Sequence, residues 1–543
     1  MRGFEVMFTR RLKQARIFYP LVVISVLIFH PCCSRKISQD NFILITLDTQ
    51  REDHISAYNP GRASTPNIDG LAEQGILFDN CYSLIPITLP SHASIFYSQP
   101  PHMIKNYNNG QPVHPKRKRP SFINAFKKNG FITAAFVSLG VLKSNFNLNE
   151  GFDTYVDSFP SQRWYLTAEE VNEKAIPWLE SNQNNKFFLW LHYSDPHDPY
   201  SPPDHLPDCT LYLNEEVIGK FNLGQYEKHE ITFDLKEGHN EFTFHVENSF
   251  DPGPFKARLD ILDFNLTPEM NKVLNINLFW GWFIRQDPRV YFMKEHGIIH
   301  IDNSGEPCSM TLTFRGKLNL PLEGVQSLYR QEVEYMDKEL GRLFQKLKEL
   351  GLMEKTHILL VGDHGEGLGE YINPLGDPHI GHIHYLENIY MKVPLIIYNP
   401  HKKKAERFSQ SVTLIDLAPT IFQIMGLKKF SHFKGRDIFS RKKKSRDIFQ
   451  ETYAPEAIRD RFALLRYPHH LIFCPAENQY TLYHLENDPY EKQNIFSTES
   501  LSPEIAKLKN DLDDFARNVI KSKEEIKIDK ETEDMLRSLG YIK

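Results

Sequence analysis

Cysteine and net charge are both scarce in this sequence, and each scarcity excludes a class of protein. Six cysteines occur among 543 residues, and only Cys81, Cys209, Cys308 and Cys474 lie beyond the first 35. These four are too few and too far apart for a disulfide framework or a Cys-ligated zinc site, although Cys209 and Cys308 could pair. The formal net charge of -5 gives no indication of nucleic-acid binding. Short basic runs at 115–120 and 441–446 are therefore expected to be solvated loops, and nucleic acid is not an expected partner.

Long apolar runs are equally scarce, and the one that stands out lies near the amino terminus. The basic segment MRGFEVMFTRRLKQAR precedes the apolar run IFYPLVVISVLIFH, which Cys32 and Cys33 follow. This order is typical of a secretory signal peptide or a single membrane anchor. The run is short for a full span, and a cysteine directly after it indicates lipid modification. We expect residues 1–35 to be a signal peptide or a membrane or lipid anchor, with the body of the chain outside the cytoplasm, in the periplasm or cell envelope.

The body of the chain alternates apolar strands with amphipathic helices. The segment NFILITLDT (41–49) is a continuous apolar run that ends in an acidic residue, which predicts a buried parallel strand with Asp48 at its carboxyl end. A helix, a glycine and a strand then recur, most clearly before the strand THILLVG (356–362) and Asp363. Strands that alternate with helices predict a doubly wound α/β fold.

The pattern of apolar and polar residues changes in two further regions. From about 204 to 318 the chain carries short, alternating, aromatic-rich strands, which predict an inserted β-sandwich of roughly a hundred residues. This insertion has either a structural or lid-like role or a carbohydrate-binding role. It divides the catalytic core into 40–203 and 319–430. Residues 431–543 are predicted to form a small α+β subdomain that ends in a charged amphipathic helix.

Three strand ends supply groups that could do chemistry. Asp48, the pair Asp363 and His364, and the loop of Thr88 (ITLPSHASIF, 87–96) are expected at one sheet edge. Two carboxylates, an imidazole and a hydroxyl suit one divalent cation. A threonine hydroxyl is too weakly acidic to attack at neutral pH, but a nearby cation lowers its pKa. The sequence therefore predicts a metal site beside a Thr88 nucleophile.

Histidines are concentrated in the loops that follow the strands. His197 lies in HYSDPHDPYSPP, and GDPHIGHIHYLEN holds His379, His382 and His384. Histidines in such loops are more typical of ligands, acids or anion binders than of core residues.

Segments throughout the chain now show a family resemblance. In order, NFILITLDTQREDHISAY, STPNIDGLAEQGILFDNCYS, TLPSHASIF, DPHDPYSPP, VGDHGEGLGE, VPLIIYNP, VTLIDLAPTIFQIMGL, LYHLENDPYEKQNI and LRSLGYIK resemble the signature segments of the sulfatase family in the alkaline phosphatase superfamily. The resemblance implies a mixed sheet flanked by helices and covers nearly everything outside the signal and the inserted β region.

The resemblance also implies a metal site. Family members bind one divalent cation, calcium in typical sulfatases, with manganese, magnesium or zinc as alternatives here. Asp48, Asp363 and His364 match three ligand positions, and Thr88 is expected against the metal. The fourth position is Thr49, where a typical sulfatase has a second Asp, so the site loses one charged ligand.

The nucleophile motif departs from the usual sulfatase pattern. Sulfatases convert the Cys or Ser of a Cys/Ser-x-Pro-x-Arg motif to formylglycine, whereas this register reads Thr88-Leu-Pro-Ser-His92. Thr88 is not expected to become formylglycine, His92 replaces the arginine, and Cys81 lies too early to substitute. The Lys-x-His segment expected near AAFVSLGVL is also missing. A threonine here resembles phosphodiesterases, phosphonate hydrolases and phosphoethanolamine transferases of the superfamily.

These residues predict a metal-dependent hydrolase of sulfate or phosphate esters. Thr88 would attack the sulfur or phosphorus centre, His197 would stabilise the equatorial oxygens, and His382 or His92 would protonate the leaving group. The substrate is an anionic ester on a glycan or a lipid. The alternatives are a phosphoethanolamine-type transferase or phosphodiesterase and, in another class, an inactive glycan- or metal-binding protein.

Overall fold

The computed structural model of the chain describes residues 37–114, 118–160, 163–198, 200, 202, 208–222, 228–246, 258–268, 275–284, 290–319, 322–372, 376, 378–440, 446–453, 459–497, 501–520 and 529–539. The expected signal peptide or anchor at 1–35, with Cys32 and Cys33, lies outside the described residues. Among the helices that are described, none is both long and apolar enough to cross a membrane.

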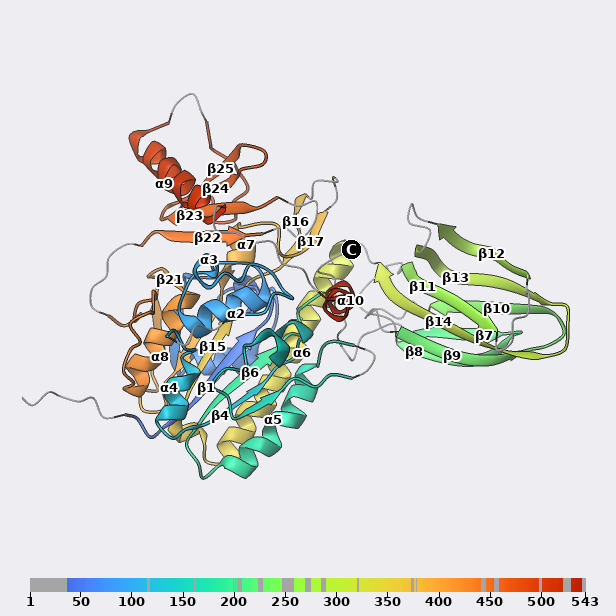
Figure 1. The fold of residues 1–543 in the computed structure, drawn as a ribbon, viewed down its shortest axis with the longest axis horizontal. Helices are drawn as coiled ribbons and strands as arrows, with labels where there is room; N and C mark the ends of the chain where they lie inside the picture. Colours follow the sequence, from blue (N-terminus) through green and yellow to red (C-terminus); the bar gives the residue numbers. More distant parts are fainter. Residues whose placement is uncertain are drawn as a thin grey trace, which may run out of the picture. The chain divides into compact units, whose positions relative to one another are not determined.

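A mixed eight-stranded sheet forms the centre of the fold (Figure 1). Its order is β20 (Glu406–Phe408), β2 (Gly75–Phe78), β19 (Leu395–Tyr398), β15 (Thr356–Gly362), β1 (Asn41–Leu47), β6 (Phe187–Tyr193), β4 (Ile132–Phe136) and β5 (Thr154–Val156). The strands from β15 to β5 run parallel, whereas β19 is antiparallel to both β15 and β2. The predicted α/β fold class is confirmed.

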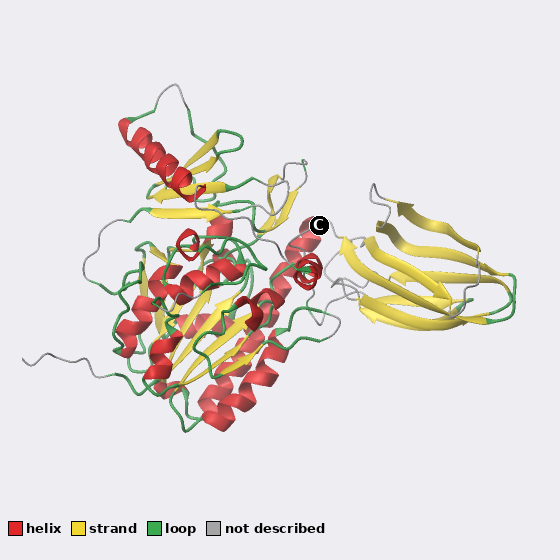
Figure 2. Ribbon diagram, viewed as in Figure 1, coloured by secondary structure: helices red, strands yellow, loops and turns green. Residues whose placement is uncertain are grey.

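Helices cover both faces of this sheet (Figure 2). Successive residues of β1 point to opposite faces, so Phe42 and Leu44 join one buried cluster and Ile43 and Ile45 join another. The first cluster includes residues of α2 (Thr88–Tyr97), α4 (Ile123–Lys128) and α8 (Leu417–Met425), and the second includes residues of α1 (Pro66–Ala72), α5 (Ala168–Asn182) and α6 (Leu322–Glu349). A strand buried on both faces explains why NFILITL is continuously apolar.

The region between 208 and 319 forms its own antiparallel sheet (Figure 1). Its strands are β7 (Asp208–Leu213), β8 (Glu216–Asn222), β9 (Lys228–Leu235), β10 (Gly238–Val246), β11 (Arg258–Pro268), β12 (Asn275–Ile284), β13 (Val290–Asn303) and β14 (Cys308–Asn319). The main path runs β8-β7-β10-β13-β11-β14-β9. Phe233 on the edge strand β9 nevertheless lies 5.2 Å, between ring centroids, from Phe242 on β10. The sheet therefore folds over its own apolar core.

The predicted pairing of Cys209 and Cys308 is wrong. Cys209 lies on β7 and Cys308 on β14, and no disulfide joins them. The strands of this region are instead held by antiparallel pairing and by an apolar cluster that includes Cys209 itself.

The carboxyl-terminal part contains a four-stranded antiparallel sheet and two helices. The strands are β22 (Ile448–Thr452), β23 (Arg461–Arg466), β24 (His469–Cys474) and β25 (Gln479–His484). Helix α9 (Pro503–Ile520) packs on β23 and β24, whereas α10 (Lys530–Ser538) contacts Gly140–Leu142 of the core. Smaller elements complete the core: β3 (Cys81–Tyr82), β18 (Lys392–Val393) and β21 (Val412–Thr413) in one sheet, the hairpin β16 (Gly367–Ile372) with β17 (Pro378–Gly381), and the short helices α3 (Pro101–Ile104) and α7 (Asn388–Met391).

Candidate active site

Two carboxylates meet at the carboxyl ends of the two central strands. In the parallel pair β1 and β15, Leu47 is in register with Gly362, so the next residues, Asp48 and Asp363, leave the sheet side by side. Neither residue is exposed to solvent. This is the sheet edge at which parallel α/β proteins build their sites.

Asp48 is held by a histidine on the neighbouring strand. Its Oδ2 lies 3.1 Å from Nε2 of His192 on β6, and Nδ1 of that imidazole lies 2.7 Å from the Ser138 hydroxyl. Burial disfavours the charged carboxylate, but the hydrogen bond from His192 and the nearby imidazoles hold the pKa of Asp48 below its usual range. Asp48 is therefore an ionised carboxylate with a fixed orientation.

Asp363 uses only one of its oxygens in hydrogen bonds. Oδ1 accepts from the backbone N–H groups of Thr49 and His364, at 3.2 and 2.7 Å. Oδ2 is buried and has no hydrogen-bond partner. Burial and the adjacent Asp48 carboxylate raise the pKa of Asp363 well above its usual range. Two buried carboxylates side by side favour a cation between them.

The imidazole of His364 faces the same point. Its Nδ1 donates to the Gly365 carbonyl at 3.1 Å, which leaves Nε2 as the nitrogen that lies 3.4 Å from Asp363 Oδ2 and 3.8 Å from Asp48 Oδ1. Burial lowers the pKa of His364 to about 4, so the ring is neutral near pH 7. Metal-ligating histidines are oriented by a second hydrogen bond of this kind.

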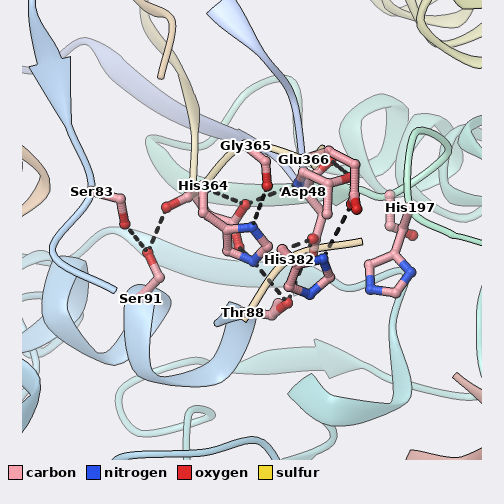
Figure 3. Close-up of polar contacts among 12 residues, drawn as sticks. Asp48, Ser83, Thr88, Ser91, His197, His364, Gly365, Glu366 and His382 are labelled. Atoms are coloured by element: carbon pink, nitrogen blue, oxygen red, sulfur yellow. Dashed lines mark hydrogen bonds and ion pairs between the residues drawn. The ribbon is translucent and has the colours of Figure 1, made fainter. Parts of the chain in front are cut away.

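Thr88 opens helix α2 directly beside this cluster (Figure 3). Its Oγ1 lies 3.4 Å from His364 Nε2 and 3.5 Å from Asp48 Oδ1. The side chain is completely buried. The structure thus brings together four of the residues expected at the metal site: Asp48, Thr88, Asp363 and His364.

Thr49 lies next to the cluster, but its hydroxyl points elsewhere. Oγ1 lies 2.7 Å from the Asp48 carbonyl oxygen and 2.8 Å from the Pro196 carbonyl oxygen, so its single proton is directed at these two backbone acceptors. Its φ of 53° is in the left-handed region, which a β-branched residue adopts only when its surroundings impose it. The geometry therefore gives Thr49 a backbone role, through its N–H to Asp363, rather than the metal-ligand role predicted from the sequence.

His92 lies behind Thr88, one helical turn along α2. Its Nδ1 lies 2.8 Å from the Thr88 carbonyl and its Nε2 lies 3.0 Å from the Thr46 hydroxyl. The ring is fully buried, and burial lowers its pKa to about 3. With both nitrogens directed at these groups, His92 supports the start of α2, and this position does not favour the predicted role as a leaving-group acid.

His197 and His382 lie on the other side of His364. The ring centroid of His382 is 4.5 Å from that of His364 and 5.1 Å from that of His197, and all three are labelled in Figure 3. Nδ1 of His382 lies 3.1 Å from Oε2 of Glu366, whose carboxylate is fully buried. His379 belongs to a different group, because its Nδ1 lies 2.9 Å from the Tyr390 hydroxyl.

Three polar residues of the site were not predicted. His192 is a single histidine in an apolar strand, which carries no sequence signal. Glu366 stands in the DHGE segment that identified Asp363, and a buried acid two residues after His364 could have been found there. Asn109 accepts the Leu89 N–H through Oδ1 at 2.9 Å, and its Nδ2 is a buried donor without a partner.

The cluster fits a divalent cation. Asp48, Asp363 and His364 each offer a ligand atom, and these atoms lie within 4.8 Å of one another. Oδ2 of Asp363, which is buried and accepts no hydrogen bond, is the kind of oxygen that a cation satisfies. Two carboxylates and one imidazole suit a hard or borderline divalent ion.

Comparison with known protein families shows to which family this chain belongs. A family profile described as Sulfatase matches residues 40–427. The chain belongs to the sulfatase family. A second profile, described as N-sulphoglucosamine sulphohydrolase, C-terminal, matches residues 383–518 of this sulfatase-family protein. The family expected from the signature segments is confirmed.

Relatives of this sulfatase-family protein span most of its length. N-acetylglucosamine-6-O-sulfatase of Bacteroides thetaiotaomicron is 22% identical over 500 residues, which cover 84% of this chain and 82% of the relative. Arylsulfatase of Clostridium perfringens is 23% identical over 490 residues, which cover 86% of this chain and 92% of the relative.

Solved structures share the fold at low sequence identity. A protein in complex with its substrate D-glucosamine-2-N,6-O-disulfate matches with a TM-score of 0.58 and 16% identity, covering 90% of this chain and all 100% of that chain. Phosphonate monoester hydrolase of Agrobacterium radiobacter matches with a TM-score of 0.57 and 15% identity, covering 89% of this chain and 96% of that chain. This sulfatase-family protein therefore shares the fold of these solved structures.

Proposed function

We propose that this sulfatase-family protein hydrolyses sulfate or phosphate esters with Thr88 as its nucleophile, without formylglycine. The observation that carries the proposal is the position of the Thr88 hydroxyl, 3.4 Å from His364 Nε2 and 3.5 Å from Asp48 Oδ1. A divalent cation bound by Asp48, Asp363 and His364 would lower the pKa of this hydroxyl and offset the carboxylate charge. Calcium is the cation expected from the family, with manganese, magnesium or zinc as alternatives.

Thr88 attacks the sulfur or phosphorus centre in line with the leaving group. A bond forms between Thr88 Oγ1 and that centre while the bond to the ester oxygen breaks, and the hydroxyl proton is released to water, since the low pKa of Asp48 makes its carboxylate a poor base. A water molecule then releases sulfate or phosphate and restores Thr88. His92 contributes by holding the carbonyl of Thr88, 2.8 Å from its Nδ1, and thus the start of α2.

Donors around Thr88 are available for the non-bridging oxygens of the substrate. The Nδ2 of Asn109 is buried beside the start of α2 and lacks a partner, so an anionic oxygen there would satisfy it. His197, 5.1 Å from His382 between ring centroids, supplies a second donor. These two donors partly replace the missing Lys-x-His segment.

We assign protonation of the leaving group to His382. Glu366 Oε2 lies 3.1 Å from Nδ1 of His382 and fixes the orientation of the ring. Nε2 carries a proton for the leaving-group oxygen only when the ring is cationic, a state that burial disfavours by lowering the pKa of His382 and that the Glu366 carboxylate and the anionic ester would favour. That proton moves to the leaving-group oxygen as the ester bond breaks, and the ring is left neutral. Glu366 acts here as a positioning residue.

The substrate class is proposed from the family and the site together. We propose an anionic ester on a glycan, because named relatives act on sulfated sugars such as N-acetylglucosamine-6-sulfates, with a lipid-borne ester as the alternative. The amino-terminal segment is proposed to bring the enzyme to the cell envelope, attached to a membrane. A phosphodiesterase or phosphoethanolamine-type transferase is the second candidate, because threonine replaces the formylglycine precursor.

The test uses purified protein with an aryl sulfate, an aryl phosphate and an aryl phosphodiester, each with calcium, manganese or zinc. Thr88→Ala should abolish turnover and Thr88→Ser should retain part of it, with unchanged thermal unfolding in both. Mass spectrometry of the peptide that contains Thr88 should show an unmodified threonine, and a sulfo or phospho adduct after an acid quench. Absence of turnover on every ester, or full turnover by Thr88→Ala, overturns the proposal and leaves the binding-protein alternative.

A further inference from the structure

A second cluster of metal-ligating side chains lies at the other end of the central strands. Asp40 directly precedes β1, His357 is the second residue of β15, and His401 follows the end of β19. The register of β1 with β15 pairs Phe42 with His357, so Asp40 and His357 start the same two strands that end at Asp48 and Asp363. This cluster is formed by the tertiary fold alone.

The three side chains converge on one point. Oδ2 of Asp40 lies 2.8 Å from Nε2 of His401 and 3.3 Å from Nε2 of His357. The three potential ligand atoms all lie within 4.8 Å of one another. Two imidazoles that present Nε2 to one carboxylate oxygen form the two-nitrogen, one-oxygen donor set of borderline transition metals.

Contacts around the cluster hold two of the ligands in place. The ring of His357 stacks on that of Phe42 at a centroid distance of 6.3 Å and an interplanar angle of 22°. Oδ2 of Asp40 also accepts a hydrogen bond of 2.8 Å from the Ser38 hydroxyl, and the Ser38 N–H bonds the Met425 carbonyl. Ligating carboxylates usually carry such an outer hydrogen bond.

Exposure differs strongly among the three ligands. The side chain of His357 is 5% exposed and that of Asp40 is 20% exposed, whereas His401 is 60% exposed. A cation can therefore reach the cluster from solvent, and water can complete its coordination. Three lysines follow His401, but their ammonium groups are paired: Lys402 and Lys404 with Glu406, and Lys403 with Glu354.

We propose that Asp40, His357 and His401 bind a second divalent transition metal, of the zinc class, separate from the catalytic cation. The bound ion links the segment before β1, which contains Asp40, to β15 and to the loop after β19. Its role is structural, because β1 has seven residues and, at about 3.3 Å per residue, separates the two sites by roughly 25 Å. Ester hydrolysis does not depend on it.

The decisive experiment isolates this site by removing the catalytic one. Chelator-treated Asp363→Asn protein is titrated with zinc. Calorimetry measures the stoichiometry and affinity of zinc binding, and thermal unfolding measures the change in stability. We expect one equivalent to bind and the unfolding midpoint to rise. Adding His401→Ala, an exposed and therefore tolerated change, should weaken zinc binding at least about tenfold. Adding His114→Ala, which removes an exposed histidine outside both sites, should leave the affinity unchanged.

A second measurement covers the case in which Asp363→Asn fails to fold. Metal analysis of zinc-loaded protein should give one equivalent more in wild type than in His401→Ala, which should retain wild-type ester hydrolysis. Equal zinc affinity with and without His401, or equal zinc content in the two proteins, would show that the three residues form only a hydrogen-bonded cluster. Because zinc uptake is measured without an ester, failure here is distinguishable from failure of the proposed hydrolase activity.

Discussion

The imidazole of His192 and the carboxylate of Asp48 form a fully buried pair, with 3.1 Å between Nε2 and Oδ2. The other carboxylate oxygen, Oδ1, faces Thr88 and His364. His192 therefore orients the carboxylate through Oδ2, on the side away from Thr88. Outer partners of metal ligands of this kind are needed for tight binding.

His192→Gln should therefore lower metal affinity by about 10- to 100-fold, with much of kcat recovered at saturating metal. Activity measured against free metal concentration, after chelator treatment, gives both numbers. His401→Ala is the matched control, because it removes a histidine at the opposite end of β1. A large loss of kcat at saturating metal with unchanged affinity would contradict this assignment.

Metal removal should destabilise the protein as well as inactivate it. Without a cation, Asp48 and Asp363 face each other with burial and mutual repulsion raising the pKa of Asp363. A cation at a hundred times its dissociation constant should add about 2.7 kcal/mol to the free energy of unfolding. Thermal unfolding with chelator and with added calcium, manganese or zinc measures this. Asp363→Asn should remove most of the stabilisation that calcium gives the wild-type protein. An equal rise in unfolding midpoint on adding calcium to wild type and to Asp363→Asn would contradict this prediction.

Glu366→Gln should distinguish an effect on the orientation of His382 from an effect on substrate binding. The variant keeps a side chain of the same shape but weakens the hold on His382 Nδ1, 3.1 Å away. We expect kcat to fall by about 10- to 100-fold for esters with poor leaving groups and KM to change little. Esters with good leaving groups need little protonation and should lose much less. An equal loss for both kinds of ester would indicate a purely structural role.

The ion pair of His102 with Glu451 should make stability depend on pH. Nδ1 of His102 lies 3.1 Å from Oε1 of Glu451, and although burial opposes it, the carboxylate raises the pKa of His102 above its unfolded value of 6.5. The stabilisation is fully present below pH 6.5 and is lost as the pH rises through the folded pKa. The difference in unfolding midpoint between wild type and His102→Gln should therefore be larger at pH 5.5 than at pH 8.5. A difference that grows with pH would contradict this sign.

Gly365 is required by the close approach of α7. A Cβ at this position would collide with the carbonyl oxygen of Ile389, while its N–H bonds the Tyr390 carbonyl at 2.7 Å. Gly365→Ala should cost about 1–3 kcal/mol and displace the neighbouring His364, which reduces activity. The control is Gly70→Ala in α1, where a Cβ meets nothing within 4 Å and helix propensity improves. Denaturant unfolding of both variants measures the difference.

Much of the site followed from strand ends. The apolar runs 41–47 and 356–362 had to be buried strands, and parallel strands in one sheet end at the same edge, so Asp48 and Asp363 were expected together. Thr88 was identified by its motif register. His192 could not be found, because its partner Asp48 directly follows another strand, 144 positions away in sequence.

The sequence pattern did not reveal the directions in which the side chains point. The sequence suggested Thr49 as a ligand, but a left-handed backbone at φ 53° and two carbonyl acceptors turn its hydroxyl away. It also suggested His92 as an acid, whereas the fold sets its ring against Thr88 and Thr46. Such directions depend on contacts between distant segments, which a local pattern does not contain.

By itself, the sequence determined the family, the α/β core and the residue types of the proposed active site, because apolar periodicity and motif order are local properties. Only the tertiary structure decided which of those residues face Thr88, that Glu366 and His192 hold them, and that Asp40, His357 and His401 meet. The physical reason is strand register: pairing β1 with β15 and β6 fixes which side chains become neighbours at each end of the sheet.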